Sequence, residues 1–141
     1  MITDMRKTIG LISLLVVLLT TVSGAIACTS SPSATSEESA IRAYADPATE
    51  TTLQGLSENN LAKYTQNANS EFKVAVTQEI LEAAADQINS QLGSYESKEF
   101  LRTEEQDGYT IVHYKAKYAK DEVGVRMVFD KDQLVSGQWF E

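Results

Sequence analysis

The segment DGYTIVHYKAKY, from Asp107 to Tyr118, decides the fold class. Asp-Gly is a strong signal for a two-residue hairpin turn, and the residues after it alternate between apolar and polar, as in a strand with one buried face. The segment VGVRMVF, from Val123 to Phe129, repeats this alternation. Together with the flanking polar turns, the pattern predicts an antiparallel meander of four strands, at 96–105, 109–119, 122–130 and 134–140.

A tight turn at Lys120 and Asp121 would fix the register of the second hairpin. Directly opposite residues on one face are then all apolar or aromatic, as expected of a core face. The predicted pairs are Val112 with Phe129, Tyr114 with Met127, Ala116 with Val125, and Tyr118 with Val123. The first hairpin would place Leu101 beside Tyr114 and Thr103 beside Val112, and Val135, Gly137 and Trp139 would extend the same face on the last strand.

The residues before the sheet show helical spacing. Thr77 can cap a helix over 78–92 that ends at Gly93, and Asp46-Pro47 is typical of an earlier helix start. We therefore predict helices at 48–58, 60–66 and 78–92. Because the apolar face of a sheet must be covered, the expected fold is a single α+β domain over residues 46–141, with N-terminal helices packed on one face of the sheet.

The first 28 residues predict export. Arg6 and Lys7 precede an uncharged stretch that ends in small residues, and the lone cysteine, Cys28, follows it directly. Ala25-Ile26-Ala27-Cys28 resembles the lipobox of bacterial lipoproteins. The resemblance implies that residues 1–27 are a lipoprotein signal peptide, that the Cys28 thiol carries lipid, and that the protein is extracytoplasmic and attached to the cell membrane through that lipid. An uncleaved membrane helix and ordinary secretion are the alternatives.

Composition narrows the function further. Residues 28–45 are rich in small and polar side chains, which predicts a flexible, lipid-anchored tether. The 141-residue chain has a net charge of −8, which argues against nucleic acid as a partner. One cysteine allows no internal disulfide, and one histidine without cysteine partners does not predict a metal site. No Gly-x-Ser-x-Gly motif is present. We expect no cofactor, and the catalytic residues, if any, stay unknown.

Two candidate sites follow from the predicted sheet. On the core face, a glycine inside a strand, among tyrosines and a tryptophan, indicates a bend or a small apolar cavity with polar tips. Its residues are Tyr114, Tyr118, Met127, Gly137 and Trp139. The core face shows no evident buried acid, which argues against isomerase-type chemistry there.

The opposite face gathers bases, with Lys115 predicted opposite Arg126 and Arg102 opposite His113. The full set is Lys98, Arg102, His113, Lys115, Lys117 and Arg126, with Phe100 and Ile111 as apolar neighbours. This basic face is either a solvated face whose lysines discourage sheet association or a site for an acidic protein partner or a second copy.

Residues 53–141 also resemble a small prokaryotic envelope domain family of unknown function. The features that carry the resemblance are Gly55-Leu56, Asn59-Asn60, Phe72-Lys73, Thr77-Gln-Glu, Leu92-Gly93-Ser94-Tyr95, Val125-Arg-Met-Val-Phe-Asp130 and Ser136-Gly137. Members occur on lipoproteins or before secreted α/β-hydrolases. The resemblance implies a nuclear-transport-factor-two-like (cystatin-like) fold and carries over no catalytic residue.

Two functions remain open from the sequence. The first is a lipid-anchored binding or accessory domain without catalysis, which holds a small apolar ligand or docks a partner through the sheet. The alternative is a small enzyme of the hydrolase or isomerase type that uses the helix–sheet cavity.

Overall fold

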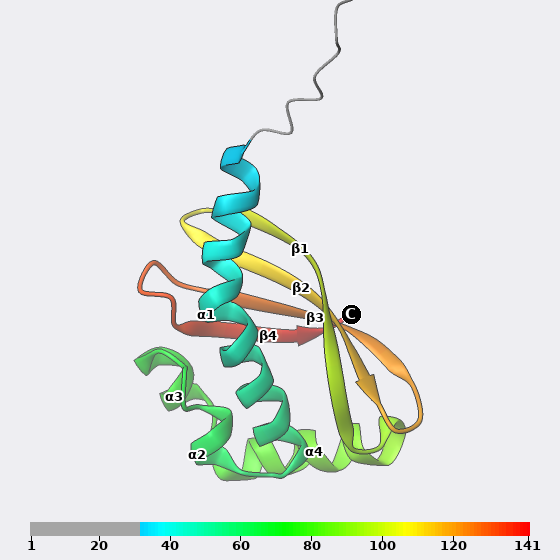
Figure 1. The fold of residues 1–141 in the computed structure, drawn as a ribbon. Coiled ribbons are helices and arrows are strands. Elements are labelled where there is room, and N and C mark those ends of the chain that lie inside the picture. Colours follow the sequence, from blue (N-terminus) through cyan, green and yellow to red (C-terminus); the bar gives the residue numbers. More distant parts are fainter. Residues whose placement is uncertain (1–31) are drawn as a thin grey trace, which may run out of the picture. The chain divides into compact units, whose positions relative to one another are not determined.

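The computed structural model describes residues 32–141, so the predicted signal peptide, Cys28 and residues 29–31 lie outside the described part. The helices come first: α1 (Pro32–Ser57), α2 (Leu61–Tyr64), α3 (Ser70–Ala75) and α4 (Gln78–Leu92). The strands follow: β1 (Tyr95–Gln106), β2 (Tyr109–Tyr118), β3 (Glu122–Phe129) and β4 (Val135–Phe140). The strands form one antiparallel sheet in the order β1-β2-β3-β4, which confirms the predicted α+β meander (Figure 1).

Helix α1 begins 16 residues before the predicted start, at Pro32 rather than at residue 48. Residues 32–45, expected to belong to a flexible tether, are therefore helical. The physical reason is burial: Ile41 is 9% exposed and Ala45 is fully buried, and both pack into the core. Pro47 lies inside the helix, where it removes one backbone hydrogen bond. Packing along the helix outweighs this local penalty.

The predicted helix over 78–92 is confirmed as α4, with both of its caps. The Thr77 hydroxyl accepts a hydrogen bond from the Ile80 amide at 3.3 Å, and Gly93 ends the helix with φ of +82°. The helix predicted at 60–66 is the four-residue α2. Helix α3 was not predicted; it begins after Asn69, whose side chain accepts a hydrogen bond from the Phe72 amide at 2.9 Å.

None of the helices within residues 32–141 has the length and apolarity of a segment that spans a bilayer.

The register between β2 and β3 differs from the prediction by two residues. Tyr114 pairs with Val125 and Val112 with Met127, because the turn lies at Ala119 and Lys120 rather than at Lys120 and Asp121. The turn is tied to the end of α4, since the Ala119 amide donates to the Ser94 carbonyl and the Lys120 amide to the Leu92 carbonyl. A shift of two keeps every side chain on its predicted face.

Two irregularities in β1 change which residues face the helices. Thr103 pairs with Val112 and Arg102 with His113, as predicted, but the register then shifts at Leu101, so that Phe100 rather than Leu101 pairs with Tyr114. A one-residue bulge moves every following side chain to the other face. Phe100 and Lys98 therefore lie on the helix-covered face, and Leu101 is 52% exposed.

A bulge in β4 has the same effect at the other edge of the sheet. Val135 pairs with Phe129, but Gly137 pairs with Val128 and Trp139 with Arg126, with a register shift between the two pairings. The core face therefore keeps Val135, while Gly137 and Trp139 lie on the outer face, contrary to the prediction. The main core lies between α1 and the inner face of the sheet and includes Leu53, Val112, Tyr114, Tyr118, Val125, Met127 and Phe129.

Candidate functional site

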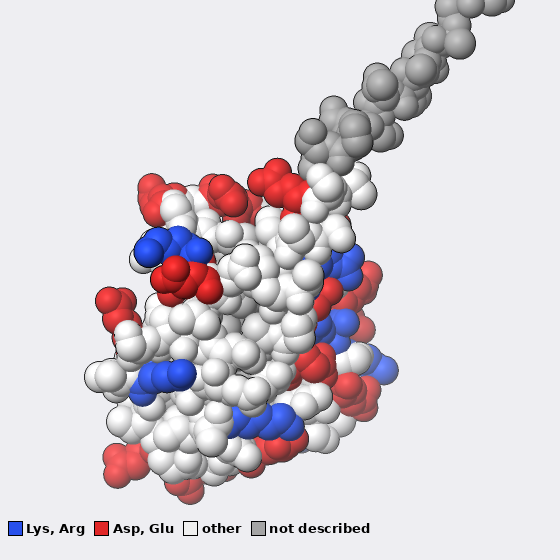
Figure 2. All heavy atoms as spheres, turned by 60° about the vertical axis from the view of Figure 1, so that its left-hand side comes forward, with Lys and Arg blue, Asp and Glu red and all other residues white. Residues whose placement is uncertain are grey.

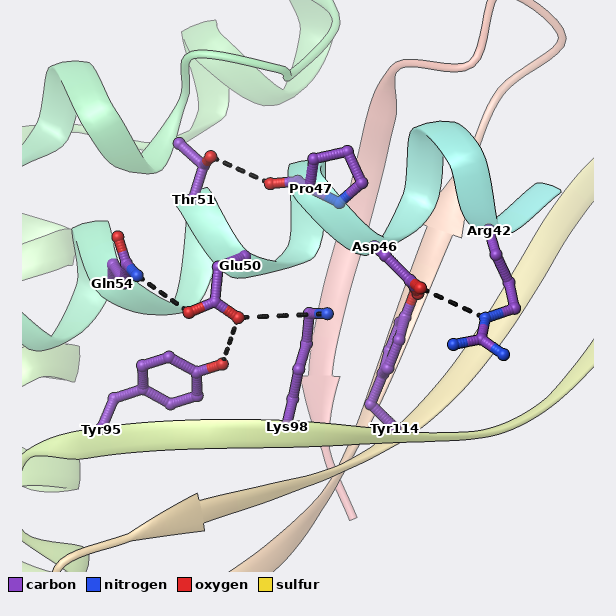
Figure 3. A network of polar contacts seen from close by, with 9 residues as sticks. All are labelled: Arg42, Asp46, Pro47, Glu50, Thr51, Gln54, Tyr95, Lys98 and Tyr114. Atoms are coloured by element: carbon purple, nitrogen blue, oxygen red, sulfur yellow. Dashed lines mark hydrogen bonds and ion pairs between the residues drawn. The ribbon is translucent and has the colours of Figure 1, made fainter. Parts of the chain in front are cut away.

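An aspartate of α1 contacts a buried tyrosine of the sheet (Figure 3). The Tyr114 hydroxyl donates a hydrogen bond to Asp46 Oδ1 at 2.9 Å, and Arg42 Nε donates one to Asp46 Oδ2 at 3.2 Å. Burial, together with the neighbouring Asp46 carboxylate, raises the pKa of Tyr114 well above its usual value. Tyr114 therefore stays protonated and acts as a hydrogen-bond donor.

A second carboxylate–tyrosine pair lies one turn further along α1. Glu50 accepts hydrogen bonds from the Tyr95 hydroxyl at 2.7 Å and from Gln54 Nε2 at 2.8 Å. Lys98 Nζ lies 4.0 Å from Glu50 Oε2 and 4.9 Å from the centroid of the Tyr114 ring, and its side chain is only 11% exposed. Burial first, and then the bond to Glu50, raise the pKa of Tyr95.

These contacts show that acids do face the sheet, contrary to the expectation from sequence. Arg42, Asp46, Glu50 and Gln54 recur every four residues, which places them along one stripe of a helix. This signal was hidden because the helix was expected to start after Asp46. Each carboxylate is already held by at least two donors. The network joins α1 to the sheet, and both acids act in it as hydrogen-bond acceptors.

The five predicted cavity residues do not come together. Tyr114, Tyr118 and Met127 are buried on the inner face, whereas Gly137 and Trp139 lie on the outer face because of the β4 bulge. A Cβ atom built on Gly137 would lie 2.2 Å from Trp139 Cη2. The glycine therefore makes room for an indole ring laid across the strand, and it does not open a pocket.

Five of the six predicted bases share the outer face, and Lys98 does not. One row runs across the sheet as Arg102, His113, Arg126 and Trp139. Lys115 pairs with Gly124 rather than with Arg126, so the predicted contact between these two bases is not made.

Each of these five bases has a carboxylate within 4 Å, so the face is balanced in charge rather than basic. The pairs are Arg102–Glu104 at 2.9 Å, His113–Glu104 at 2.7 Å, Lys115–Glu122 at 3.1 Å, Lys117–Glu96 at 3.2 Å and Arg126–Glu141 at 3.6 Å. The hydrogen bond from His113, and then the one from Arg102, hold the pKa of Glu104 below its usual value. The carboxylate of Glu122 raises the pKa of Lys115.

Trp139 is the main apolar feature of this outer face. It is 47% exposed, and the Arg126 guanidinium lies 4.8 Å from the centroid of its ring. Tyr109 is 44% exposed, and Ile111, from the same strand, is buried. The helices lie against the opposite face of the sheet (Figure 1). The outer face thus presents an aromatic ring held by a cation and by Gly137.

A groove that the sequence did not predict is lined by α1, by the loop between α2 and α3 and by the loop between β3 and β4. Its volume is about 420 Å³, and it is lined by Tyr44, Pro47, Ala48, Thr51, Gln66, Asn67, Asp132, Gln133 and Leu134. We call it the amide groove, after the side chains of Gln66, Asn67 and Gln133. Asp132 is its one charged lining residue, and Figure 2, which turns the side of α3 and the β3–β4 loop forward, shows a broad uncharged area with charged side chains around it.

Two loops that line the groove are held in place by hydrogen bonds. Asn69 Nδ2 donates to Asp130 Oδ2 at 3.1 Å, and Asp130 Oδ1 accepts from the amides of Asp132 and Leu134. Burial acts to raise the pKa of Asp130, but these hydrogen bonds outweigh it and keep the pKa below its usual value. Ala68 also forms an isolated parallel β-bridge with Val135. The groove is therefore built from three separate segments, and for this reason no single sequence motif pointed to it.

Within residues 32–141, no group of three or more His, Cys, Asp or Glu side chains is placed to hold a metal ion.

The comparisons with known proteins concern the fold and the family. Among solved structures, the chain is similar to the NMR structure of a protein from Ruminococcus gnavus ATCC 29149, with a TM-score of 0.51 over 72% of this chain and 89% of that chain. The two sequences are 14% identical, so the similarity shows the fold alone. The comparison with curated proteins found no match. The model of the family described as "Protein of unknown function (DUF3887)" matches residues 49–137, more than half of the chain, and the protein therefore belongs to this family.

Proposed function

We propose that this protein is a lipid-anchored, extracytoplasmic accessory domain that acts by binding rather than by catalysis. The lipobox-like segment that ends at Cys28 supports the anchor, since acyl chains on a cysteine hold a protein stably at a membrane. The arrangement of helices on one face of an antiparallel sheet supports a relationship to the nuclear-transport-factor-two-like folds.

The observation that carries the binding role is the outer face of the sheet. It presents a half-exposed tryptophan beside Arg126 and Gly137, and aromatic and arginine side chains dominate the energetics of protein interfaces. Because each base on this face is paired with an acid of the same chain, two copies can approach each other there without strong charge repulsion. We therefore take a second copy of the chain as the partner, related by a twofold axis.

Association can be tested on the full chain in a mild detergent by native mass spectrometry. We expect a dimer that dissociates in Trp139→Ala, because the variant removes the central aromatic contact. Ile80→Ala is the matched control, since Ile80 is also about half exposed but lies on α4. A monomer at all concentrations, or a dimer that Trp139→Ala leaves intact, would rule out docking through the outer face.

The anchor needs a separate test. The chain is expressed in a bacterial host, and its intact mass and membrane fraction are compared with those of Cys28→Ala. Lipidation predicts loss of residues 1–27, added acyl mass and a membrane location, all abolished by the substitution. A soluble product that retains its N-terminal residues would refute the anchor and leave the docking proposal standing.

The alternative is a small hydrolase or isomerase that uses the helix–sheet interface. Its support is the presence of two carboxylate–tyrosine pairs, Asp46 with Tyr114 and Glu50 with Tyr95. A general base must be able to accept the proton that it abstracts. Here each carboxylate is held by donors in a network that joins α1 to the sheet, which gives both acids a structural role without any catalysis.

A further inference from the structure

The geometry points to the amide groove as a binding site for a neutral oligosaccharide. The outer face of the sheet takes no part in this site, so the inference is independent of the docking proposal. It depends on three features of the groove: its free hydrogen-bonding groups, its lack of cations and its apolar surfaces.

The free groups are side-chain amides. Among the described residues, the side chains of Gln66, Asn67 and Gln133 have no hydrogen-bond partner, although all three line the groove. Each amide offers two donors and a carbonyl acceptor. A sugar hydroxyl both donates and accepts, so adjacent hydroxyls match such amides.

The charge of the groove selects against ionic ligands. It is lined by no lysine or arginine, and Asp132 is its one carboxylate. A phosphate or carboxylate ligand would meet no lysine or arginine on the lining, and the adjacent Lys131 ammonium is already paired with Asp132 Oδ2 at 3.6 Å. The neutral hydroxyl groups of a sugar can instead donate to that carboxylate in a charge-assisted hydrogen bond.

The apolar surfaces fit the carbon faces of sugar rings. Tyr44 is half-buried and packs edge-on against Phe129, with ring centroids 5.4 Å apart, so its ring is held in place. Pro47 is exposed beside it, and Leu134 is 39% exposed on the facing loop. The groove therefore offers apolar surface from α1 and from the loop between β3 and β4, together with the three amides.

An extended peptide fits the groove less well than a saccharide. Peptides in extended form are bound chiefly through free main-chain groups of a strand. Around this groove those groups are used internally: the Val135 amide donates to the Asn67 carbonyl, the Asn69 amide to the Val135 carbonyl, and the Gln133 amide to the Asp130 carbonyl. The side-chain groups that line the groove and can bind a sugar are the three amides and the Asp132 carboxylate.

The test is a titration of the ¹⁵N-labelled full chain, in a zwitterionic detergent without a sugar headgroup. The probes are maltotetraose and N-acetylchitotetraose, with acetylated and amidated tetra-alanine as the peptide comparison. We expect at least one tetrasaccharide to give saturable amide shifts confined to the groove. No saturable shifts with either saccharide, shifts elsewhere, or binding of the peptide alone would overturn the inference.

Variants tie the binding to the amides. Gln133 has a φ of 63°, a conformation that glycine adopts without strain, so Gln133→Gly removes the amide while retaining the loop. We expect this variant and Asn67→Ala each to weaken binding about fivefold, the effect of losing one hydrogen bond. Gln91→Ala removes an exposed amide of α4 and should leave the affinity unchanged. Equal affinities in all variants would also overturn the inference.

Discussion

Two tyrosines of β2 show how the surroundings of one atom decide the effect of a substitution. Tyr114 and Tyr118 are both buried on the inner face, but only the Tyr114 hydroxyl has a partner, Asp46 at 2.9 Å. Among the described residues the Tyr118 hydroxyl has none. A buried polar group without a partner costs about 1–3 kcal/mol, so the same deletion of an oxygen atom should have opposite effects at the two positions.

We predict that Tyr118→Phe leaves the free energy of unfolding unchanged or raises it by up to about 1 kcal/mol. Tyr114→Phe should lower it by about 1–3 kcal/mol, because it takes one donor from a partly buried carboxylate. Urea denaturation measures both. A larger loss in Tyr118→Phe than in Tyr114→Phe would mean that the Tyr118 hydroxyl has a partner in solution.

Gly137 provides a second prediction at the scale of a residue. A Cβ atom there would collide with the far end of the Trp139 indole and not with the backbone. We therefore expect Gly137→Ala to displace the ring into water and to lower the free energy of unfolding by about 1–3 kcal/mol. Trp139 is the chain's one tryptophan, so its fluorescence emission should move to longer wavelength.

Gly124→Ala is the control for this prediction. A Cβ atom at Gly124 would lie 3.3 Å from the Glu141 carbonyl oxygen and has no Trp139 atom among its nearest neighbours. Its emission should stay at the wild-type wavelength. An unshifted spectrum in Gly137→Ala would show that the indole does not lie over the glycine.

At the scale of elements, the sequence predicted what local signals encode. Helix α4 carries its own start signal in Thr77 and its own stop signal in Gly93. Asp107-Gly108 encodes the first hairpin through two successive positive φ angles, 53° and 82°. The start of α1 could not be predicted in this way. Pro47 is a local signal for a helix start, and only the burial of Ile41 and Ala45 against the sheet carries the helix past it.

The bulges explain why the candidate sites were harder to predict than the fold. Alternation assigns a face to each strand residue only while the register is unbroken. The shifts at Leu101 and in β4 moved Lys98 to the inner face and Trp139 to the outer one. The amide groove required the packing of three segments, which no periodicity reports.

The β1 bulge leads to a prediction about Lys98. Because Lys98 lies under α1 near Glu50 and over the Tyr114 ring, Lys98→Glu places a second carboxylate beside Glu50 in a confined site. We expect the free energy of unfolding to fall by about 1–3 kcal/mol, between the effects for an exposed and a buried ion pair, because Lys98 is 11% exposed and Glu50 is 38% exposed.

Lys115→Glu is the matched control, because Lys115 lies on the neighbouring strand with its side chain 48% exposed on the outer face. An exposed ion pair contributes about 0–1 kcal/mol, so this variant should lose far less stability, as measured by urea denaturation. Equal losses in the two variants would place Lys98 on the outer face, as the unbroken alternation had suggested.

At the scale of the whole molecule, partly buried tyrosines of α2 and β1 and buried tyrosines of β2 link its stability to alkaline pH. Burial raises the pKa of Tyr64 and of Tyr118 to about 12, and burial with a neighbouring carboxylate raises the pKa values of Tyr95 and Tyr114 as well. An unfolded tyrosine ionises near pH 10. Above that pH the unfolded chain therefore binds fewer protons than the native one, and stability falls as pH rises.

We predict that the urea midpoint holds steady up to about pH 10, the tyrosine pKa in the unfolded chain, and then falls steeply toward pH 12, where Tyr64 and Tyr118 ionise in the folded protein.

Absorbance at 295 nm reports tyrosinate, and circular dichroism reports the fold. Below about pH 12 the two signals should change together for Tyr64 and Tyr118, since at those pH values these hydroxyls ionise mainly in the unfolded chain. Tyr118→Phe removes one of the groups responsible, so its midpoint should decline less steeply with pH than that of the wild type. A midpoint that does not depend on pH between 10 and 12, or a full tyrosinate signal from a chain that is still folded, would show that these hydroxyls are open to solvent and that the packing of α1 and α2 over the sheet is looser than described.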